Sequence, residues 1–188
     1  MRALRNEVRI IAGRWRGRRL RFPPAGQIRP TPDRVRETLF NWLQGSLDGA
    51  RCLDLFSGSG ALAFEALSRG ADSAVLVDRD PAVATYLREA IATLGAVGAE
   101  VQCLGATSFL RGSGRRFDLV FLDPPFGDDA LAPLLEALIE SQRLAARAWV
   151  YIEHAARTDP PPLPPGLAIW RSKRAGEVSY HLLRWEGG

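Results

Sequence analysis

The sequence contains few cysteines and histidines, which limits the kinds of site that it can build. Its two cysteines, Cys52 and Cys103, each lie within or beside an apolar run, so small buried side chains are expected rather than a disulfide. His154 and His181 are expected to be isolated structural residues. No group of these residues has metal-ligand spacing, and no metal is predicted.

The sequence also has no long apolar run. No segment approaches the ~20 apolar residues that a membrane-spanning helix requires. The N-terminus is charged from Arg2 onward and carries no apolar stretch of the kind found in signal peptides. These absences predict a cytoplasmic protein without a membrane partner, and nothing in the sequence requires more than a monomer.

Lysine is nearly absent, because Lys173 is the only lysine among 25 basic residues. The net charge is +4 and the isoelectric point about 9.7. Arginine carries a planar fork that suits phosphate and stacks on bases. Genome composition can produce the same preference for arginine, so the overall bias is compatible with either origin.

The distribution of the arginines is more informative than their number. Eleven lie between Arg2 and Arg36, where Glu7 and Asp33 are the acidic residues and Trp15 is an interleaved aromatic. A basic segment with aromatics is typical of a nucleic-acid interface, although a solvated basic hairpin has the same composition. The predicted RNA contacts are Arg14, Trp15, Arg16, Arg18, Arg19 and Arg29.

The chain of 188 residues, 46% of them hydrophobic, suits one domain with a short appendage. Residues 1–30 are expected to form a basic hairpin arm, with strands at 8–12 and 18–22, and residues 31–188 the main domain. Thr31 is the expected N-cap of a helix that has Pro32 in its first turn and ends near Leu47.

From Arg51 onward, short apolar runs alternate with helical patterns. Strand–helix alternation of this kind predicts an α/β fold with a mostly parallel sheet covered by helices on both faces. A C-terminal hairpin should add an antiparallel strand. The expected strands are 52–56, 73–78, 100–104, 119–123, 148–153, 167–171 and 178–185, and the expected helices 61–69, 81–94, 108–111 and 129–141.

The motif Asp123-Pro124-Pro125-Phe126 follows directly on a predicted buried strand. Each proline fixes its φ angle and lacks an N–H, so the carbonyl groups of this stretch have few internal donors. A carboxylate, free carbonyls and an aromatic ring suit a flat, amine-bearing ring. We therefore interpret these four residues as the catalytic group.

A glycine-rich turn, Phe56-Ser57-Gly58-Ser59-Gly60, links the first central strand to a helix. Gly58 and Gly60 permit a tight turn and close approach of a ligand. Asp54, just before the turn, disfavours a pyrophosphate but can receive an ammonium group. Asp78 ends the next strand, where an acid commonly binds ribose hydroxyls. This combination fits S-adenosylmethionine, whereas NAD satisfies only part of it.

With these motifs in place, the chain resembles the Rossmann-like, S-adenosylmethionine-dependent methyltransferases that modify exocyclic amines. Two further stretches, Arg-Ile-Ile-Ala-Gly-Arg-Trp-Arg-Gly-Arg at 9–18 and Arg-Pro-Thr-Pro-Asp-Arg-Val-Arg-Glu-Thr-Leu-Phe-Asn at 29–41, are similar to the bacterial 16S ribosomal RNA guanine-N2 methyltransferase family. The resemblance covers nearly the whole chain. Its departures are arginine in place of lysine and a proline-rich loop at 159–165.

The resemblance implies a seven-stranded class I methyltransferase fold with an N-terminal hairpin extension. It implies methyl transfer to the N2 amine of a guanine, at position 966 of 16S rRNA, within an assembling small subunit. The helix from Thr31 is expected to close over the cofactor or to reach the RNA. The cofactor-binding residues are predicted to be Asp54, Phe56, Ser57, Gly58, Gly60, Asp78, Arg79, Ala106, Thr31 and Arg34.

Three other functions are compatible with parts of this pattern. A DNA adenine-N6 methyltransferase shares the acid–proline–aromatic motif, but this chain has no room for a separate target-recognition region. A non-enzymatic RNA-binding assembly protein would not need Asp54, Asp78 and Asp123 together. An NAD-dependent oxidoreductase would require an acid or base for hydride transfer that is not evident here.

Overall fold

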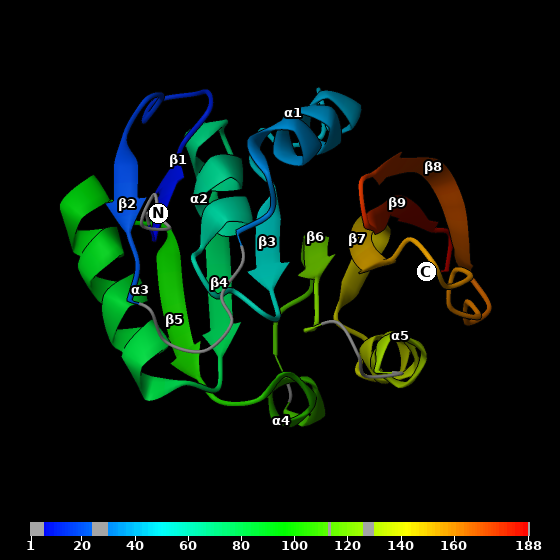
Figure 1. Cartoon of the computed structure of the whole chain (residues 1–188). Coiled ribbons are helices and arrows are strands. Elements are labelled where there is room, and N and C mark those ends of the chain that lie inside the picture. The colour runs from blue at the N-terminus through cyan, green and yellow to red at the C-terminus, as the bar shows by residue number, and fades with distance from the viewer. Residues whose placement is uncertain (1–5, 24–29, 113, 126–129, 188) are drawn as a thin grey trace.

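A computed structural model describes residues 6–23, 30–112, 114–125 and 130–187. Seven strands form one sheet in the order β5-β4-β3-β6-β7-β9-β8 (Figure 1). The central strands pair in parallel, and β9 pairs antiparallel to both of its neighbours. Their bounds are β3 Arg51–Asp54, β4 Ser73–Asp78, β5 Ala99–Cys103, β6 Phe117–Leu122, β7 Leu144–Ala155, β8 Leu167–Ala175 and β9 Val178–Trp185.

Helices cover both faces of this sheet, as the alternating pattern predicted. One face packs against α1 (Asp33–Trp42), α2 (Ala61–Ser68) and α3 (Pro81–Leu94). The other packs against α4 (Ala106–Arg111) and α5 (Leu131–Glu140). The strands can be apolar on both sides because each face is covered. Cys52 and Leu53, for example, are both fully buried but belong to opposite faces.

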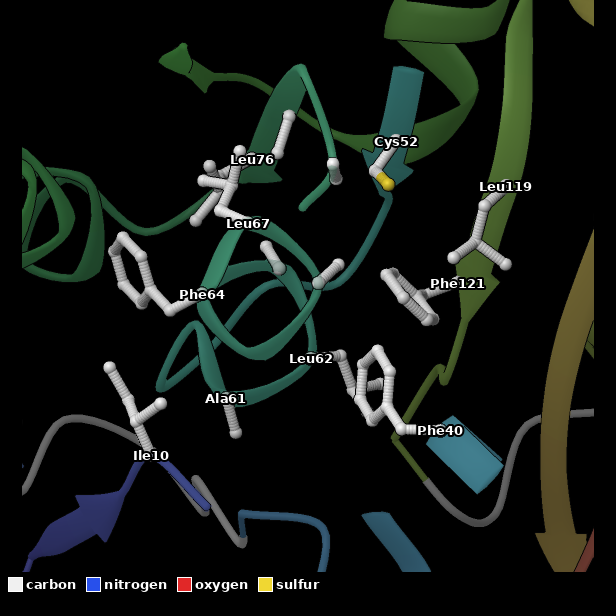
Figure 2. Close-up of a cluster of buried hydrophobic side chains, with 14 of the residues drawn as sticks. Ile10, Phe40, Cys52, Ala61, Leu62, Phe64, Leu67, Leu76, Leu119 and Phe121 are labelled. Carbon is white, nitrogen blue, oxygen red and sulfur yellow. The ribbon is translucent and has the colours of Figure 1, made fainter. Parts of the chain in front are cut away.

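The N-terminal strands β1 (Glu7–Arg9) and β2 (Arg19–Arg21) form a separate antiparallel hairpin. Its apolar side chains belong to the same core as α1, α2 and α3; they are Val8, Ile10, Trp15, Leu20 and Phe22. Figure 2 shows Ile10 beside Phe64 and Ala61 of α2, with Phe40 of α1 against Leu62. The hairpin is therefore packed onto the helical layer.

Three local expectations differ from the structure. The N-cap of α1 is Pro32 and not Thr31, and no side chain caps this helix. The helix ends at Trp42, with turns after it in place of the helix expected up to Leu47. Cys103 is exposed, since β5 lies at the sheet edge. The expected helix start at Asp129 lies outside the described residues.

The expectation that the two histidines are isolated is also wrong. The rings of His154 on β7 and His181 on β9 are parallel, with centroids 5.0 Å apart. Their Nε2 atoms lie 2.8 Å apart, and Ser172 hydrogen-bonds to the Nδ1 atom of His181 at 2.6 Å. Register explains the contact, because the antiparallel pairing places His154 opposite Ser179 and His181 opposite Ile152.

Candidate active site

The predicted site residues follow strands that end at one edge of the sheet. Asp54 is the last residue of β3, Asp78 the last of β4, and Asp123 comes directly after β6. Because these strands are parallel, their carboxyl ends meet at the same edge, where ligands bind in open α/β sheets. The arrowheads of β3 and β4 point to this edge in Figure 1.

The turn after β3 is held against β4 by backbone hydrogen bonds. Ser57 N–H donates to the carbonyl of Val77 at 3.0 Å, and the Ser57 hydroxyl donates to the carbonyl of Asp54 at 3.0 Å. Gly58 N–H donates to Asp78 Oδ2 at 3.0 Å. The turn is thus fixed to the acid that ends the neighbouring strand.

Gly60 is required by both backbone conformation and packing. Its φ angle is +72°, and a Cβ there would lie 2.4 Å from Cε2 of Phe64. This close approach brings the first turn of α2 against the loop. Tyr86 of α3, which the sequence did not single out, donates its hydroxyl to the carbonyl of Ser59 at 2.9 Å.

Asp78 organises the second loop as well as the first. Its Oδ1 accepts the N–H of Asp80 at 3.0 Å, and Asp80 in turn caps α3 by accepting the N–H of Ala82 at 2.8 Å. Asp78 remains partly exposed and Arg79 is exposed. The carboxylate is therefore fixed in place while part of it faces the edge where a ligand would lie.

A cluster of carboxyl groups forms where β3 and β6 end, beside Glu153 near the end of β7. Asp54 is 3% exposed and Glu153 of β7 is 4% exposed. Leu122 pairs with Ile152, so Asp123 and Glu153 follow side by side on adjacent strands. Asp123 is partly exposed, and the charges of Glu153 and Asp54 lie close enough to act on it.

Burial raises the pKa of each of these acids. Burial raises the pKa of Asp54 to about 7, with a further contribution from the Asp78 charge, while backbone N–H groups of Phe56 and Ala63 oppose it. The pKa of Asp123 is raised well above its ordinary value by burial and then by the charges of Glu153 and Asp54. These groups are short of positive charge, and a cationic ligand at this edge would relieve their repulsion.

Glu153 has two neutral hydrogen-bond donors. Tyr151 donates its hydroxyl to Glu153 Oε1 at 2.6 Å, and Thr31 forms a side-chain hydrogen bond to the same carboxyl group. The pKa of Glu153 is raised by burial, and these two hydrogen bonds lower it in part. Sequence reasoning missed Glu153 and Tyr151. The signal was present, since Glu153 ends a predicted strand that pairs with the one before Asp123.

The remaining predicted cofactor and catalytic residues differ in how far they are buried. Pro124 is buried and Pro125 exposed, while Phe126 lies outside the described residues. Ala106 is buried at the start of α4 and Phe56 packs partly against the same core. Arg34 is exposed on α1, on the side of the turn that contains Gly176.

The predicted RNA contacts of the hairpin divide into exposed and buried residues. Arg14, Arg16, Arg18 and Arg19 are exposed. Trp15 is only 8% exposed and packs in the core, with the Arg14 guanidinium 4.0 Å from its ring centroid. Its burial leaves little of the ring for an RNA base. Arg29 lies outside the described residues.

The described part of the chain contains neither a metal-binding cluster nor a membrane-spanning helix. Residues 6–23, 30–112, 114–125 and 130–187 contain no group of three or more His, Cys, Asp or Glu residues able to hold a metal ion. In the same ranges no helix has the length and apolar character needed to cross a membrane.

The strand order, the glycine turn and the acids at the strand ends define a class I methyltransferase fold. The chain belongs to the family described as Conserved hypothetical protein 95, whose model matches residues 8–184.

Named relatives agree with this assignment over nearly the whole length. The chain is 44% identical to Ribosomal RNA small subunit methyltransferase D of Escherichia coli over 180 residues, covering 96% of this chain and 91% of the relative. It is 40% identical to the protein of the same name from Haemophilus influenzae, covering 95% and 94%. A solved structure, yhhF from Escherichia coli, superimposes with a TM-score of 0.91 at 42% identity, covering 97% and 99%.

Proposed function

We propose that this protein transfers a methyl group from S-adenosylmethionine to the exocyclic N2 amine of a guanine in small-subunit ribosomal RNA, at position 966 of 16S rRNA. The names of the relatives support ribosomal RNA as the substrate. The observation that carries the proposal is the position of Asp123. It stands at the carboxyl end of β6, beside the Asp54 turn and before two prolines.

The cofactor half of the site fits a cationic nucleoside. Asp54 and the backbone of the Ser57–Gly60 turn would receive the amino-acid portion of S-adenosylmethionine, and Asp78 the ribose hydroxyls. Ala63 stands at the third position of a dinucleotide-binding turn, which tolerates alanine, so it is Asp54 that argues against a pyrophosphate. When bound, S-adenosylmethionine supplies a methyl group activated by a positively charged sulfur.

The acid–proline corner would orient the amine of the target guanine. We assign the Asp123 carboxylate to accept one N–H of the amine and the Pro124 carbonyl to accept the other. This directs the nitrogen lone pair toward the methyl carbon, and the N–C bond forms as the S–C bond breaks. The proton released from the alkylated amine passes to Asp123 or to water. Phe126 would stack on the base, which must be unpaired to reach the site.

The raised pKa of Asp123 couples the two halves of the site. In the free protein burial, and then the charges of Glu153 and Asp54, hold the pKa of Asp123 high. A cationic donor beside Asp54 opposes this repulsion and favours the ionised form of Asp123. Asp123 therefore becomes a good hydrogen-bond acceptor for the guanine amine once S-adenosylmethionine is bound. This favours binding of S-adenosylmethionine before the guanine.

A methyl-transfer assay tests the proposal. Labelled S-adenosylmethionine is incubated with protein-free 16S rRNA, with small subunits that lack the modification, and with DNA, and the products are digested to nucleosides. N2-methylguanosine from ribosomal RNA is the expected product. Methylated adenine in DNA, or no transfer to any substrate, would overturn the proposal in favour of the alternative functions.

Asp123→Ala is the matching variant. It should lower turnover about 10²- to 10⁴-fold, because it removes the acceptor that orients the amine. Donor affinity measured by calorimetry should change little. Asp159→Ala, which removes an exposed carboxylate from a loop, is the control and should keep full activity. Comparable turnover in the two variants would remove Asp123 from the catalytic group.

A further inference from the structure

The edge strand β8 exposes nearly all of its side chains. After the buried Leu167, every residue from Ala168 to Arg174 is exposed, and among the described strands β8 pairs with β9 alone. Three exposed cationic side chains lie in its second half, those of Arg171, Lys173 and Arg174. Lys173 is the only lysine in the chain.

Strand register places two of these cations on the face of the sheet that carries α1. Arg171 pairs with Leu182 and Lys173 with Tyr180, and both partners belong to the core beneath α1. Residues two apart on a strand are separated by about 7 Å and share a face. Arg34 of α1 extends toward the Gly176 turn that joins β8 to β9, with Nη2 3.7 Å from where a Cβ on Gly176 would lie. A row of positively charged side chains therefore extends from Arg34 on α1 to Lys173 and Arg171 on β8.

Aromatic rings contact two guanidinium groups on this surface, those of Arg171 and Arg184. Trp170 lies at an irregularity of the β8–β9 register and is 45% exposed, and its ring centroid is 4.9 Å from that of Trp149. The Arg171 guanidinium lies 4.4 Å from the Trp170 centroid, and that of Arg184 lies 4.6 Å from the Trp149 centroid. Contact with a ring face restrains each guanidinium while leaving N–H donors available.

The positive charge of this surface is largely uncompensated. Among the described residues, Arg171, Lys173 and Arg184 form no ion pair. A hollow of about 490 Å³ beside Trp170 is lined by Arg147 and Arg184, with Glu186 the acid at its margin. Unpaired, oriented guanidinium groups beside an exposed indole suit a phosphate backbone and its sugars or bases.

We propose that the β8 surface, defined as Trp170, Arg171, Lys173 and Arg184, binds the phosphate backbone of the RNA substrate outside the target nucleotide. The proposal rests on the proposed function and adds a second contact region to it. In Figure 1 the hairpin β1–β2 lies at one end of the sheet, beside α3, and β8 lies at the other. The site lies between them, so one RNA can contact both ends.

The path from the site to β8 passes over α1. Thr31 hydrogen-bonds to Glu153 within the acid cluster, and Arg34, three residues later, faces the Gly176 turn. RNA that leaves the acid–proline corner in this direction meets Arg34, then Lys173 and Arg171. Contacts of this kind supply affinity and register, whereas the choice of base belongs to the site.

Two alternative roles of the β8 surface predict different outcomes. Charged side chains on an edge strand prevent pairing with a second sheet, in which case their loss would cause self-association without affecting RNA. A ribosomal protein could also meet this surface, in which case the effect of a variant would be confined to assembled subunits. RNA is favoured here because the charged side chains of the β8 surface are all positive and two of their guanidinium groups lie over tryptophan rings.

The test compares two double variants that each remove two exposed positive charges. Arg171→Gln with Lys173→Gln alters the β8 surface. Arg111→Gln with Arg116→Gln is the control, since Arg111 is the last residue of α4 and Arg116 directly precedes β6, at the opposite edge of the sheet from the site. Binding to protein-free 16S rRNA and to small subunits is measured across salt concentrations, without donor, and followed by methyl-transfer kinetics.

The β8 variant should bind both RNA substrates about 3- to 10-fold more weakly near 0.1 M salt, with a salt slope lower by about 1–2. KM for RNA should rise by a similar factor while kcat stays within about 2-fold, and the control should match the wild type. Trp170→Ala should weaken binding with little change in salt slope.

Three results would overturn the proposal: unchanged affinity and slope, self-association of the β8 variant with unchanged RNA binding, or a loss confined to subunits. RNA binding measured without S-adenosylmethionine does not depend on methyl transfer. It therefore distinguishes failure of the β8 surface proposal from failure of the proposed function. Wild-type protein that binds RNA through β8 but methylates none of the substrates would refute the activity and leave the surface supported.

Discussion

Asp54 is the residue whose charge state most directly links the structure to cofactor binding. Its side chain is 3% exposed, and burial raises its pKa to about 7. Near neutral pH the free protein is therefore a mixture of protonated and ionised forms. A bound ammonium group favours the ionised form, so donor binding should release a proton in this pH range.

We predict that affinity for S-adenosylmethionine increases between pH 6 and pH 7.5. Below the pKa of Asp54 each pH unit should tighten binding by up to about 10-fold, because a proton must leave before the ammonium can pair. The increase should level off as Asp54 becomes fully ionised. Calorimetry in two buffers of different ionisation enthalpy would measure both the affinity and the released proton.

Asp54→Asn is the matched variant, since it keeps the size of the side chain. It should bind the donor more weakly at pH 7.5 and lose most of the pH dependence. An affinity that stays flat in the wild-type protein, or an equally steep dependence in Asp54→Asn, would show that Asp54 does not receive the ammonium.

At the scale of secondary-structure elements, the hairpin is joined to α2 by a buried acid. Glu65 is fully buried and accepts the N–H groups of Ile11 at 2.8 Å and Ala12 at 3.0 Å. Its carboxylate also pairs with Arg36 at 3.3 Å and Arg69 at 2.7 Å. A buried carboxylate with two cations and two N–H donors is well satisfied, so this contact fixes the hairpin relative to the helical layer.

The same junction contains a glycine that packing requires. Gly13 has a φ of +78°, and a Cβ there would lie 1.8 Å from the Ser68 carbonyl oxygen of α2. Ser68 also accepts the N–H of Arg14 at its carbonyl and the N–H of Trp15 at its hydroxyl, at 2.8 and 3.0 Å. Any side chain at position 13 would push the loop away from these partners.

Gly13→Ala should therefore destabilise the protein by about 3–5 kcal/mol, since it separates the loop from Ser68 and Glu65. Gly17→Ala is the control, with φ +82° but nothing within 4 Å of the added carbon, and should cost about 1 kcal/mol. Urea unfolding measures both. Equal costs would mean that only the backbone angle matters and that the close contact with α2 does not.

This junction also shows what the sequence could and could not predict. The strand–helix alternation from Arg51 onward has clear periodicity, and each predicted element there has a counterpart in the structure. The arginines of the N-terminal segment suggest RNA contacts by charge alone, yet Arg36 is fully buried and pairs with Glu65. Such pairings depend on contacts between distant segments, which leave no local pattern.

The candidate site was predictable to a similar extent. Asp54, Asp78 and Asp123 could be placed at one sheet edge because parallel strands share an orientation. Glu153 was missed because its role depends on register, which places it beside Asp123 on the next strand. Burial of Trp15 was missed because an aromatic in a basic segment has the same sequence signature whether it faces RNA or the core.

At the scale of the whole molecule, the acid cluster and His181 act on stability in different pH ranges. Burial raises the pKa of Asp54, Asp123 and Glu153, so their stability contribution is present at low pH and is lost as pH rises through those pKa values. Burial and then His154 lower the pKa of His181, so its contribution is lost as pH falls below about 6.5. Above about pH 6.5 only the buried acids still make the stability depend on pH.

We therefore predict that the unfolding temperature of the ligand-free protein falls between pH 6.5 and pH 8. The free energy of unfolding should decrease by up to about 1.4 kcal/mol per pH unit for each of these acids that is still protonated in the folded protein, and the decrease should fade as that acid ionises. Glu153→Gln should flatten this dependence, because it removes one buried acid and also one of the charges that raises the pKa of Asp123. Glu177→Gln, an exposed acid in the β8–β9 turn, should leave the dependence unchanged. Thermal unfolding followed by circular dichroism at several pH values measures the slope. A slope in Glu153→Gln as steep as in the wild type would mean that the acid cluster does not control stability in this range.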